Sequence, residues 1–347
     1  MYASLDQNLR AQRGRSEAKM SQGWTRRAFL GSSLAACLPL AARSPGGGSA
    51  AVPTPGPGGW KLGIITDEIT QTLEAALDFV TSYHLHYCEL REIWGHNIMN
   101  ASPDDLDRAG KLIRDHGLTV SDVASPIFKW NLPQMPAQAE KRDTFNASFT
   151  EDDADELLKK SFELAHNLGS QKVRIFSYWR VDQPEKAYPY VRDRLARAAE
   201  LASRNGILLV LENEHTCNIG TGKELGRLLT DIGSSSLKAN WDPANAVMLG
   251  EVPYPDGYLA VRGASVNRIG HMHVKDVRKD SSGKLEWAPV GGGFVDWRGQ
   301  FEALQHDGYN ETLSLETHYR RPDGNKVEST RESLTGLLKI LQATPRT

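Results

Sequence analysis

The chain has 347 residues and a formal net charge of −2, from 41 basic and 43 acidic side chains. This near-neutral balance gives no electrostatic reason to expect a nucleic acid or an anionic membrane surface as a partner. The hydrophobic content of 39% is typical of a soluble globular protein. The three cysteines, Cys37, Cys88 and Cys217, predict neither a disulfide framework nor a thiolate metal site.

Residues 1–42 have the order of regions that is found in export signals. The paired Arg26 and Arg27 precede an apolar run that is shorter than the roughly 20 residues of a membrane-spanning helix. Paired arginines followed by Phe and Leu resemble the twin-arginine motif, so we expect export and a periplasmic location. The residues before Cys37 resemble a lipobox, so lipidation at Cys37 and cleavage at small residues further along are two alternatives. Residues 43–59, rich in Gly, Pro and Ser, are predicted to form a flexible linker.

Eight short apolar segments after Trp60 have the length and β-branched content of buried strands. They cover residues 61–66, 87–91, 118–124, 172–176, 207–211, 237–241, 269–274 and 312–315. Amphipathic stretches predict helices at residues 73–83, 103–116, 153–168, 223–232, 258–263, 297–307 and 328–341. Ser102 is suited to cap the second of these helices, because Pro103 takes the first helical position.

The alternation of strands and helices predicts a fold of the α/β class. Eight parallel units close into a (β/α)8 TIM barrel, and we expect a single such domain over residues 60–342. An open doubly wound sheet is the main alternative, but no Gly-x-Gly-x-x-Gly turn follows the first predicted strand. The loops over residues 126–150 and 276–296 are long, and long loops on one face usually carry function.

Polar residues stand at the ends of four successive predicted strands, where a barrel of this kind carries its chemistry. They are Glu212, Asp242, His273 and Glu316. Three buried carboxylates raise one another's pKa unless a cation lies between them. We therefore predict one divalent metal ion held by all four residues, with Mn²⁺ favoured and Mg²⁺, Co²⁺ or Zn²⁺ as alternatives. Each residue taken alone is also compatible with an ordinary hydrogen-bonded polar group.

His271 and His273 project to the same side of their strand, so periodicity alone does not identify the ligand. His273 is nearer the carboxyl end and is preferred, whereas His271 is expected one layer deeper. Lys275 and Arg174 are candidates to donate hydrogen bonds to substrate oxygens, with ion pairing inside the barrel as the alternative. Further candidates for the wall of a substrate pocket are His215, Glu89, Trp130 and His318.

Five motifs carry a resemblance to a known family: Leu211–Asn213, Trp241–Asn245, Gly270–Asp276, Gly291–Trp297 and Gly308–Glu316. Together they resemble the sugar phosphate isomerase/epimerase group of the xylose isomerase-like TIM barrel superfamily, over the whole predicted barrel. The resemblance implies that Glu212, Asp242, His273 and Glu316 bind a single metal ion. It also implies that the two glutamates exchange protons with a carbon atom of the substrate.

Two further segments, Thr66–Ile69 and Glu89–Arg91, also resemble some members of this group. Asn245 is a departure, because the ketose epimerases of the group have a histidine shortly after the aspartate. A plain ketose epimerase is therefore not implied, and Asn245 becomes a candidate for binding substrate.

The expected activity is removal of a proton from a carbon next to a carbonyl, with Glu212 and Glu316 as base and acid. Isomerisation or epimerisation of a free sugar, ketosugar or related polyol is the first hypothesis, and export argues against phosphorylated sugars. A lyase or dehydratase acting on keto-sugars or keto-glycosides shares the same first step. A retaining glycosidase and a non-catalytic sugar-binding barrel are further alternatives. The expected partner is thus a small carbohydrate, and a homo-oligomer is left open.

Overall fold

The computed structural model describes residues 56–135 and 144–344. The predicted export signal, Cys37 and most of the predicted linker lie outside the described residues. No helix in the described part of the chain combines the length and apolar character that a membrane span requires.

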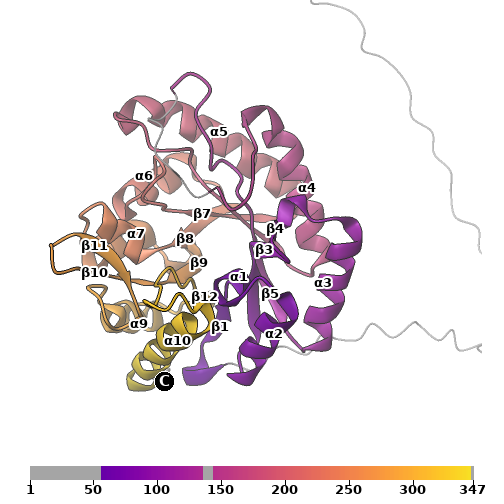
Figure 1. The fold of residues 1–347 in the computed structure, drawn as a ribbon. Helices are drawn as coiled ribbons and strands as arrows, with labels where there is room; N and C mark the ends of the chain where they lie inside the picture. The colour runs from indigo at the N-terminus through magenta and orange to yellow at the C-terminus, as the bar shows by residue number, and fades with distance from the viewer. Residues whose placement is uncertain (1–55, 136–143, 345–347) are drawn as a thin grey trace, which may run out of the picture. The chain divides into compact units, whose positions relative to one another are not determined.

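A ring of eight parallel strands forms the centre of the fold (Figure 1). Its members are β1 (Lys61–Ile64), β2 (Tyr87–Leu90), β5 (Thr119–Ala124), β6 (Lys172–Ile175), β7 (Leu208–Glu212), β8 (Leu237–Trp241), β9 (Ile269–Val274) and β12 (Thr312–Leu315). Hydrogen-bonded neighbours follow the order β1-β12-β9-β8-β7-β6-β5-β2. A parallel bridge between Ile65 and Glu89 joins the two ends of this order. The predicted (β/α)8 barrel is therefore confirmed, with every strand close to its predicted place.

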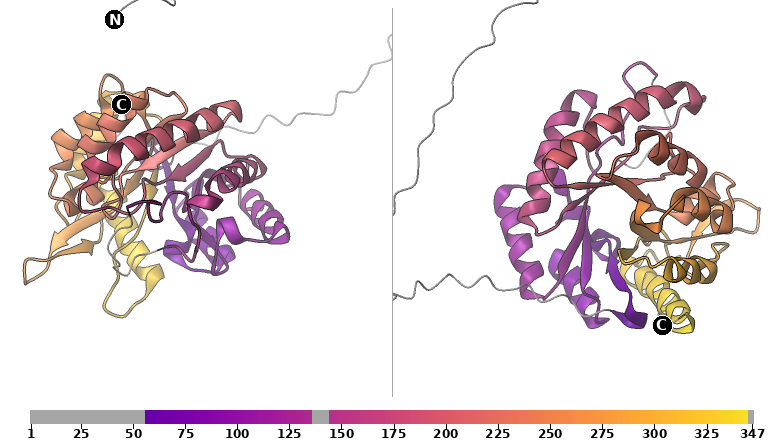
Figure 2. Two further views of the ribbon diagram at one scale, coloured as in Figure 1. Left: turned by 90° about the horizontal axis from the view of Figure 1, so that it is seen from above. Right: turned by 180° about the vertical axis from the view of Figure 1, so that it is seen from behind.

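Helices follow the strands and surround the ring (Figures 1 and 2). They are α1 (Thr66–Ile69), α2 (Leu73–Ser82), α3 (Pro103–Asp115), α4 (Ala154–Asn167), α5 (Pro184–Arg204), α6 (Gly222–Ile232), α7 (Pro243–Met248), α8 (Tyr258–Arg262), α9 (Trp297–His306) and α10 (Lys326–Ala343). Single turns of 3-10 helix occur at Pro57–Gly59, Ile98–Asn100, Glu151–Asp153 and Val266–Arg268, and a π turn at Pro253–Gly257. Ser102 caps α3 as predicted, because its Oγ accepts the Asp105 N–H at 3.2 Å.

The 21-residue helix α5 is absent from the sequence-based prediction. Pro189 lies inside it, and proline normally interrupts a helix because it lacks an N–H donor. The buried face of α5 consists partly of alanines, including Ala187, Ala198 and Ala202, which give a weak apolar pattern. Packing of this face in the core outweighs the local signals, so tertiary structure decides that the helix forms.

The long loop after β9 contains a hairpin of β10 (Asp276–Lys279) and β11 (Leu285–Ala288), drawn in orange in Figure 2. Asp276 anchors the base of this hairpin, because its carboxylate accepts the N–H groups of Gly291, Gly293 and Val295 at 2.9 to 3.2 Å. A side chain at Gly293 would overlap this carboxylate, so the close approach requires glycine. A shorter hairpin of β3 (Glu92–Ile93) and β4 (His96–Asn97) follows β2.

We expect Gly293→Ala to destabilise the protein, because the added Cβ displaces the Asp276 carboxylate from buried backbone N–H groups. Hydrogen bonds to a charged group contribute about 1.5 to 3 kcal/mol each, so the free energy of unfolding should fall by about 2 kcal/mol. Urea unfolding measures this change. Gly292→Ala is the matched control, since its Cβ would meet the Pro289 carbonyl oxygen at 3.1 Å and leave Asp276 in place. Equal stability of the two variants would contradict the anchoring role of Asp276.

Candidate functional site

The carboxyl ends of four adjacent strands bring the four predicted metal ligands together. Glu212 ends β7, Asp242 follows β8, His273 lies near the end of β9, and Glu316 follows β12. All four side chains are buried, and one oxygen or nitrogen atom from each lies within 4.8 Å of the others. Local structure fixes the orientation of the Asp242 side chain, because this side chain caps α7 by accepting the Asn245 N–H at 2.9 Å.

Three potential metal-binding atoms in this cluster are buried and have no hydrogen-bond partner among the described residues: His273 Nδ1, Glu212 Oε2 and Asp242 Oδ2. His273 Nδ1 lies 3.3 Å from Glu316 Oε2 and 3.5 Å from Glu212 Oε1, so it faces the carboxylates. Buried polar atoms in native proteins are almost always satisfied, and an unsatisfied one costs free energy. Three carboxylates with one imidazole suit a divalent cation, so the residues present fit a metal ion.

The Lys275 ammonium lies between two of the carboxylates. Its Nζ atom is 2.9 Å from Asp242 Oδ2 and 2.6 Å from Glu316 Oε2. Burial opposes the charge on Lys275, but Asp242 and Glu316 outweigh it and raise the lysine pKa well above its usual value. Burial also raises the pKa of Glu316, yet Lys275, His318 and His273 together hold that pKa well below its ordinary range. Lys275 thus keeps Glu316 in its anionic form.

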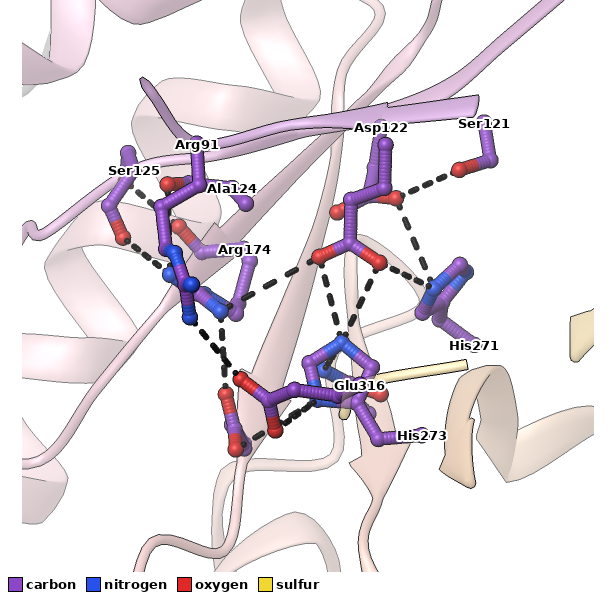
Figure 3. Close-up of polar contacts among 12 residues, drawn as sticks. Arg91, Ser121, Asp122, Ala124, Ser125, Arg174, His271, His273 and Glu316 are labelled. Atoms are coloured by element: carbon purple, nitrogen blue, oxygen red, sulfur yellow. Dashed lines mark hydrogen bonds and ion pairs between the residues drawn. The ribbon is translucent and has the colours of Figure 1, made fainter. Parts of the chain in front are cut away.

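Glu89 orients the imidazole of His273 from below the cluster. The Nε2 atom of His273 lies 3.1 Å from Glu89 Oε1 and 3.1 Å from Asn240 Nδ2. A carboxylate that accepts the Nε2 proton leaves Nδ1 directed at the other carboxylates, which is the usual arrangement of a metal-binding histidine. Figure 3 shows His273 facing Glu316, while His271 lies toward Ser121 and Asp122. His271 is one layer deeper, with Nε2 3.2 Å from Glu89 Oε2.

The structure places Glu89 and Arg174 deep in the barrel, and the substrate-binding roles predicted for them stay predictions. Both side chains are fully buried inside the barrel, below the strand ends. Arg174 Nη1 lies 3.4 Å from Glu212 Oε2, and its Nη2 donates to the Ala124 carbonyl at 3.2 Å. Neither residue lines the cavity above the cluster. In the structure they contact the metal-ligand candidates instead, Arg174 through Glu212 and Glu89 through His273.

A cavity of ≈ 430 Å³ opens above the cluster, lined by Arg91, Lys129, Glu214, His215, Trp287 and His318 among others. Two predicted pocket residues, His215 and His318, are part of this wall. Trp130 lines a neighbouring cavity instead. Asn245 and Lys275 are buried beneath the wall, and Asn245 connects it to the cluster: its Nδ2 donates to Glu212 Oε1 at 3.2 Å and its Oδ1 lies 2.9 Å from His215 Nδ1.

Arg91 is a site residue to which the sequence analysis assigned no role. Its guanidinium contacts Asp67 and Glu68 at 2.6 Å and Glu316 Oε1 at 3.2 Å. The family-like segments Thr66–Ile69 and Glu89–Arg91 contain these residues, so a signal was present in the sequence. Arg91 links the loop after β1 to the cluster and adds a second cation beside Glu316.

Trp287 on β11 forms an aromatic part of the wall, and the sequence analysis did not single it out. Its ring centroid lies 5.8 Å from that of His215 and 5.0 Å from that of His318. The hairpin anchored by Asp276 carries it there. Cys217 is buried, and burial raises the pKa of its thiol to about 12, which excludes a thiolate nucleophile at neutral pH.

The chain resembles known proteins in sequence and in fold. The family model of the xylose isomerase-like TIM barrel matches residues 77–340. An inosose dehydratase from Geobacillus thermodenitrificans (strain NG80-2) is 27% identical over 158 residues, covering 42% of this chain and 51% of the relative. The chain thus spans about half the length of the curated relatives it matches.

Solved structures share the barrel. An IOLI protein with a bound zinc atom is 17% identical with a TM-score of 0.63, covering 82% of this chain and 98% of that one. The D-allulose 3-epimerase from Methylomonas sp., in complex with D-allulose, is 15% identical with a TM-score of 0.58, covering 81% and 96% of the two chains. At these identities the likeness shows the fold alone.

We expect the affinity for a divalent metal to fall as the pH falls, because protons compete for the same donor atoms. Burial lowers the pKa of His273, but Glu89, Glu212 and Glu316 outweigh it and raise that pKa well above its usual value. Burial raises the pKa of Asp242 to about 6. The association constant for Mn²⁺ should therefore fall about tenfold per pH unit between about pH 8 and pH 6, and more steeply below, where Asp242 also takes up a proton. Chelator competition measures this constant, and a flat profile would count against the cluster.

We expect Glu89→Gln to weaken metal binding by about 10- to 100-fold, since the variant loses the carboxylate that orients His273. Titration with Co²⁺, followed by its visible absorption, reports both affinity and ligand geometry. Glu163→Gln, at an exposed position on α4, is the matched control and should bind as the unmodified protein does. Unchanged Co²⁺ affinity and spectrum in Glu89→Gln would show that Glu89 has no orienting role.

Proposed function

Because this chain belongs to the xylose isomerase-like TIM barrel family, we propose that it is a divalent-metal-dependent enzyme that removes a proton next to the carbonyl of a sugar or polyol. The observation that carries the proposal is the buried cluster of Glu212, Asp242, His273 and Glu316, with its unsatisfied donor atoms. The chemistry of this donor set supports Mn²⁺, with Mg²⁺, Co²⁺ and Zn²⁺ as alternatives.

The two glutamates occupy the outer positions of the cluster. In the ring, β12 and β7 flank β9 and β8, so Glu316 and Glu212 lie on either side of His273 and Asp242. A bound divalent ion supplies Lewis-acid polarisation of the substrate carbonyl. Glu212 and Glu316 then serve as proton acceptor and donor on the two sides of the substrate carbon. Return of the proton to the opposite face gives epimerisation, and return to the neighbouring carbon gives isomerisation.

The contacts of Glu212 and Glu316 lower the pKa of both carboxyl groups, which favours the ionised form that a base requires. Burial raises the pKa of Glu212, but His273 and Arg174 are among the groups that lower it below its ordinary value. The pKa of Glu316 is also lowered. A retaining glycosidase needs one of its two carboxyl groups protonated, with a raised pKa. The cluster therefore favours proton abstraction by carboxylates over glycoside hydrolysis.

Elimination of water is the second candidate, and the similarity to an inosose dehydratase favours it. A dehydratase needs a proton donor for the departing hydroxyl group. His215 lines the cavity, and its Nδ1 lies 3.1 Å from Glu214 Oε1. Burial lowers the pKa of His215, but Glu214 outweighs it and raises the pKa above its usual value. A protonated His215 is thus suited to this step, whereas epimerisation does not require it.

The proposed setting remains the periplasm, with a free carbohydrate as substrate. This part of the proposal rests on the Arg26–Arg27 segment and the apolar run that follows, which lie outside the described residues. Lipidation at Cys37 belongs to the same proposal.

The metal-loaded protein should exchange the α-proton of at least one member of a panel of ketohexoses and keto-inositols in D₂O, followed by NMR. Removal of the metal by a chelator should abolish exchange, and added Mn²⁺ should restore it. Glu316→Gln, assayed with excess Mn²⁺, should slow exchange by about 10² to 10⁴, the usual contribution of a general base. Glu302→Gln, an exposed residue on α9, is the matched control.

Exchange that persists after metal removal would contradict the metal-dependent mechanism. Stoichiometric metal binding without exchange of any compound in the panel would favour the non-catalytic sugar-binding barrel. Formation of a dehydrated product, with exchange, would select elimination over epimerisation.

A further inference from the structure

The side chain of Lys129 is a cation of the cavity wall that the proposed mechanism does not use. It lies in the loop after β5, and the residue is only 7% exposed. Aromatic rings surround its ammonium: the Nζ atom is 3.7 Å from the ring centre of Phe145, 4.7 Å from that of Phe176 and 5.7 Å from that of Trp179. Cation–π attraction stabilises the positive charge without using any N–H donor.

Within residues 56–135 and 144–344, no carboxylate lies within 4.0 Å of the Lys129 ammonium and no acceptor takes a hydrogen bond from it. Two arginines of the same wall are paired with carboxylates, and Lys326 Nζ donates to the Asp67 carbonyl at 3.3 Å. Arg91 contacts Asp67 and Glu68, and Arg320 Nη2 lies 2.9 Å from Glu68 Oε2. A buried ammonium with three unused donors is costly unless a ligand supplies the missing acceptor.

Glu214 is a carboxylate of the same cavity wall as Lys129. Glu214 is already engaged at short range, since its Oε1 accepts the Thr216 hydroxyl at 2.8 Å and lies 3.1 Å from His215 Nδ1. Glu214 therefore balances the charge of Lys129 from a distance and leaves its N–H groups available.

Lys129 also has a distinctive position, because it lines two neighbouring cavities. One is the cavity of ≈ 430 Å³ above the metal-binding cluster. The other, of ≈ 540 Å³, contains Trp130, Phe149 and Trp179 in its wall. A ligand in the cavity above the cluster would therefore contact the Lys129 ammonium where the two cavities adjoin. Such a contact lies on the cavity wall, and none of the four metal-ligand candidates lines either cavity.

We propose that Lys129 binds a carboxylate of the substrate, so that the enzyme acts on an acidic sugar or polyol and not on a neutral one. This inference rests on the proposed function, because it assigns the substrate class of that same site. A single ammonium with free N–H donors matches the single negative charge of a carboxylate. A phosphate group carries more charge and usually requires several donors or an arginine fork, and both arginines of the wall, Arg91 and Arg320, are already paired with carboxylates.

Binding of D-glucuronate, D-glucose and D-glucose 6-phosphate to the Mn²⁺-loaded full chain tests this inference by isothermal titration calorimetry. D-Glucuronate should bind at least tenfold more tightly than D-glucose, and D-glucose 6-phosphate should show no such advantage. Lys129→Met should remove most of the advantage of the acid while leaving D-glucose binding and metal content unchanged. Methionine keeps an unbranched apolar chain among the aromatic rings, so this variant is expected to fold. Lys111→Met, an exposed lysine on α3, is the matched control for loss of one positive charge.

Equal binding of acid and neutral sugar, absence of D-glucuronate binding, or an unchanged preference in Lys129→Met would overturn the inference. A preference for D-glucose 6-phosphate would overturn the carboxylate assignment in favour of a phosphate. These outcomes are separate from failure of the proposed function. If α-proton exchange occurs with neutral ketoses and no acid preference exists, the function stands and the role of Lys129 does not. If the acid preference depends on Lys129 but no exchange occurs, binding stands and the enzymatic proposal fails.

Discussion

The constraint on which this site depends is the burial of like charges: Glu212, Asp242 and Glu316 lie within a few ångströms of one another inside the barrel rim. Burying charged groups is tolerated only when opposite charges and hydrogen bonds surround them. Here Lys275 contacts two of the carboxylates, and Arg174 approaches the third. A bound divalent cation would add positive charge beside the carboxylates and would coordinate the oxygen and nitrogen atoms that have no hydrogen-bond partner. The pKa of each carboxylate follows from this balance and from its burial.

The residues of the site lie in three layers of different depth. The deepest layer holds Glu89 and His271, which do not line the cavity. Glu89 orients His273, and His271 contacts Glu89. The middle layer holds the candidate metal ligands, and the upper layer forms the cavity wall. Asn245 connects the middle and upper layers, because one amide group contacts both Glu212 and His215. Short, directional contacts thus link the cavity wall to the cluster.

The eight strands and the four converging strand-end residues could be predicted from the sequence, because both follow from local patterns. Apolar runs of four to six residues mark the strands, and polar residues that end such runs in a barrel share one rim. The helix α5 escaped prediction because Pro189 interrupts its pattern and alanines weaken it. The contacts of Glu89 and Arg174 with the cluster could not be predicted, since a sequence shows on which strand a residue lies but not how deep in the barrel it is.

The sequence by itself therefore determined the class of fold and the chemistry available at one rim of the barrel, since periodicity and residue type are encoded locally. Only the tertiary structure decided which polar residues support the cluster and which line the cavity. It also revealed Lys129, whose aromatic surroundings come from two loops: Phe145 from the loop after β5, and Phe176 and Trp179 from the loop after β6. The physical reason is that depth, pairing and enclosure depend on contacts between residues far apart in the chain, which closure of the ring brings together.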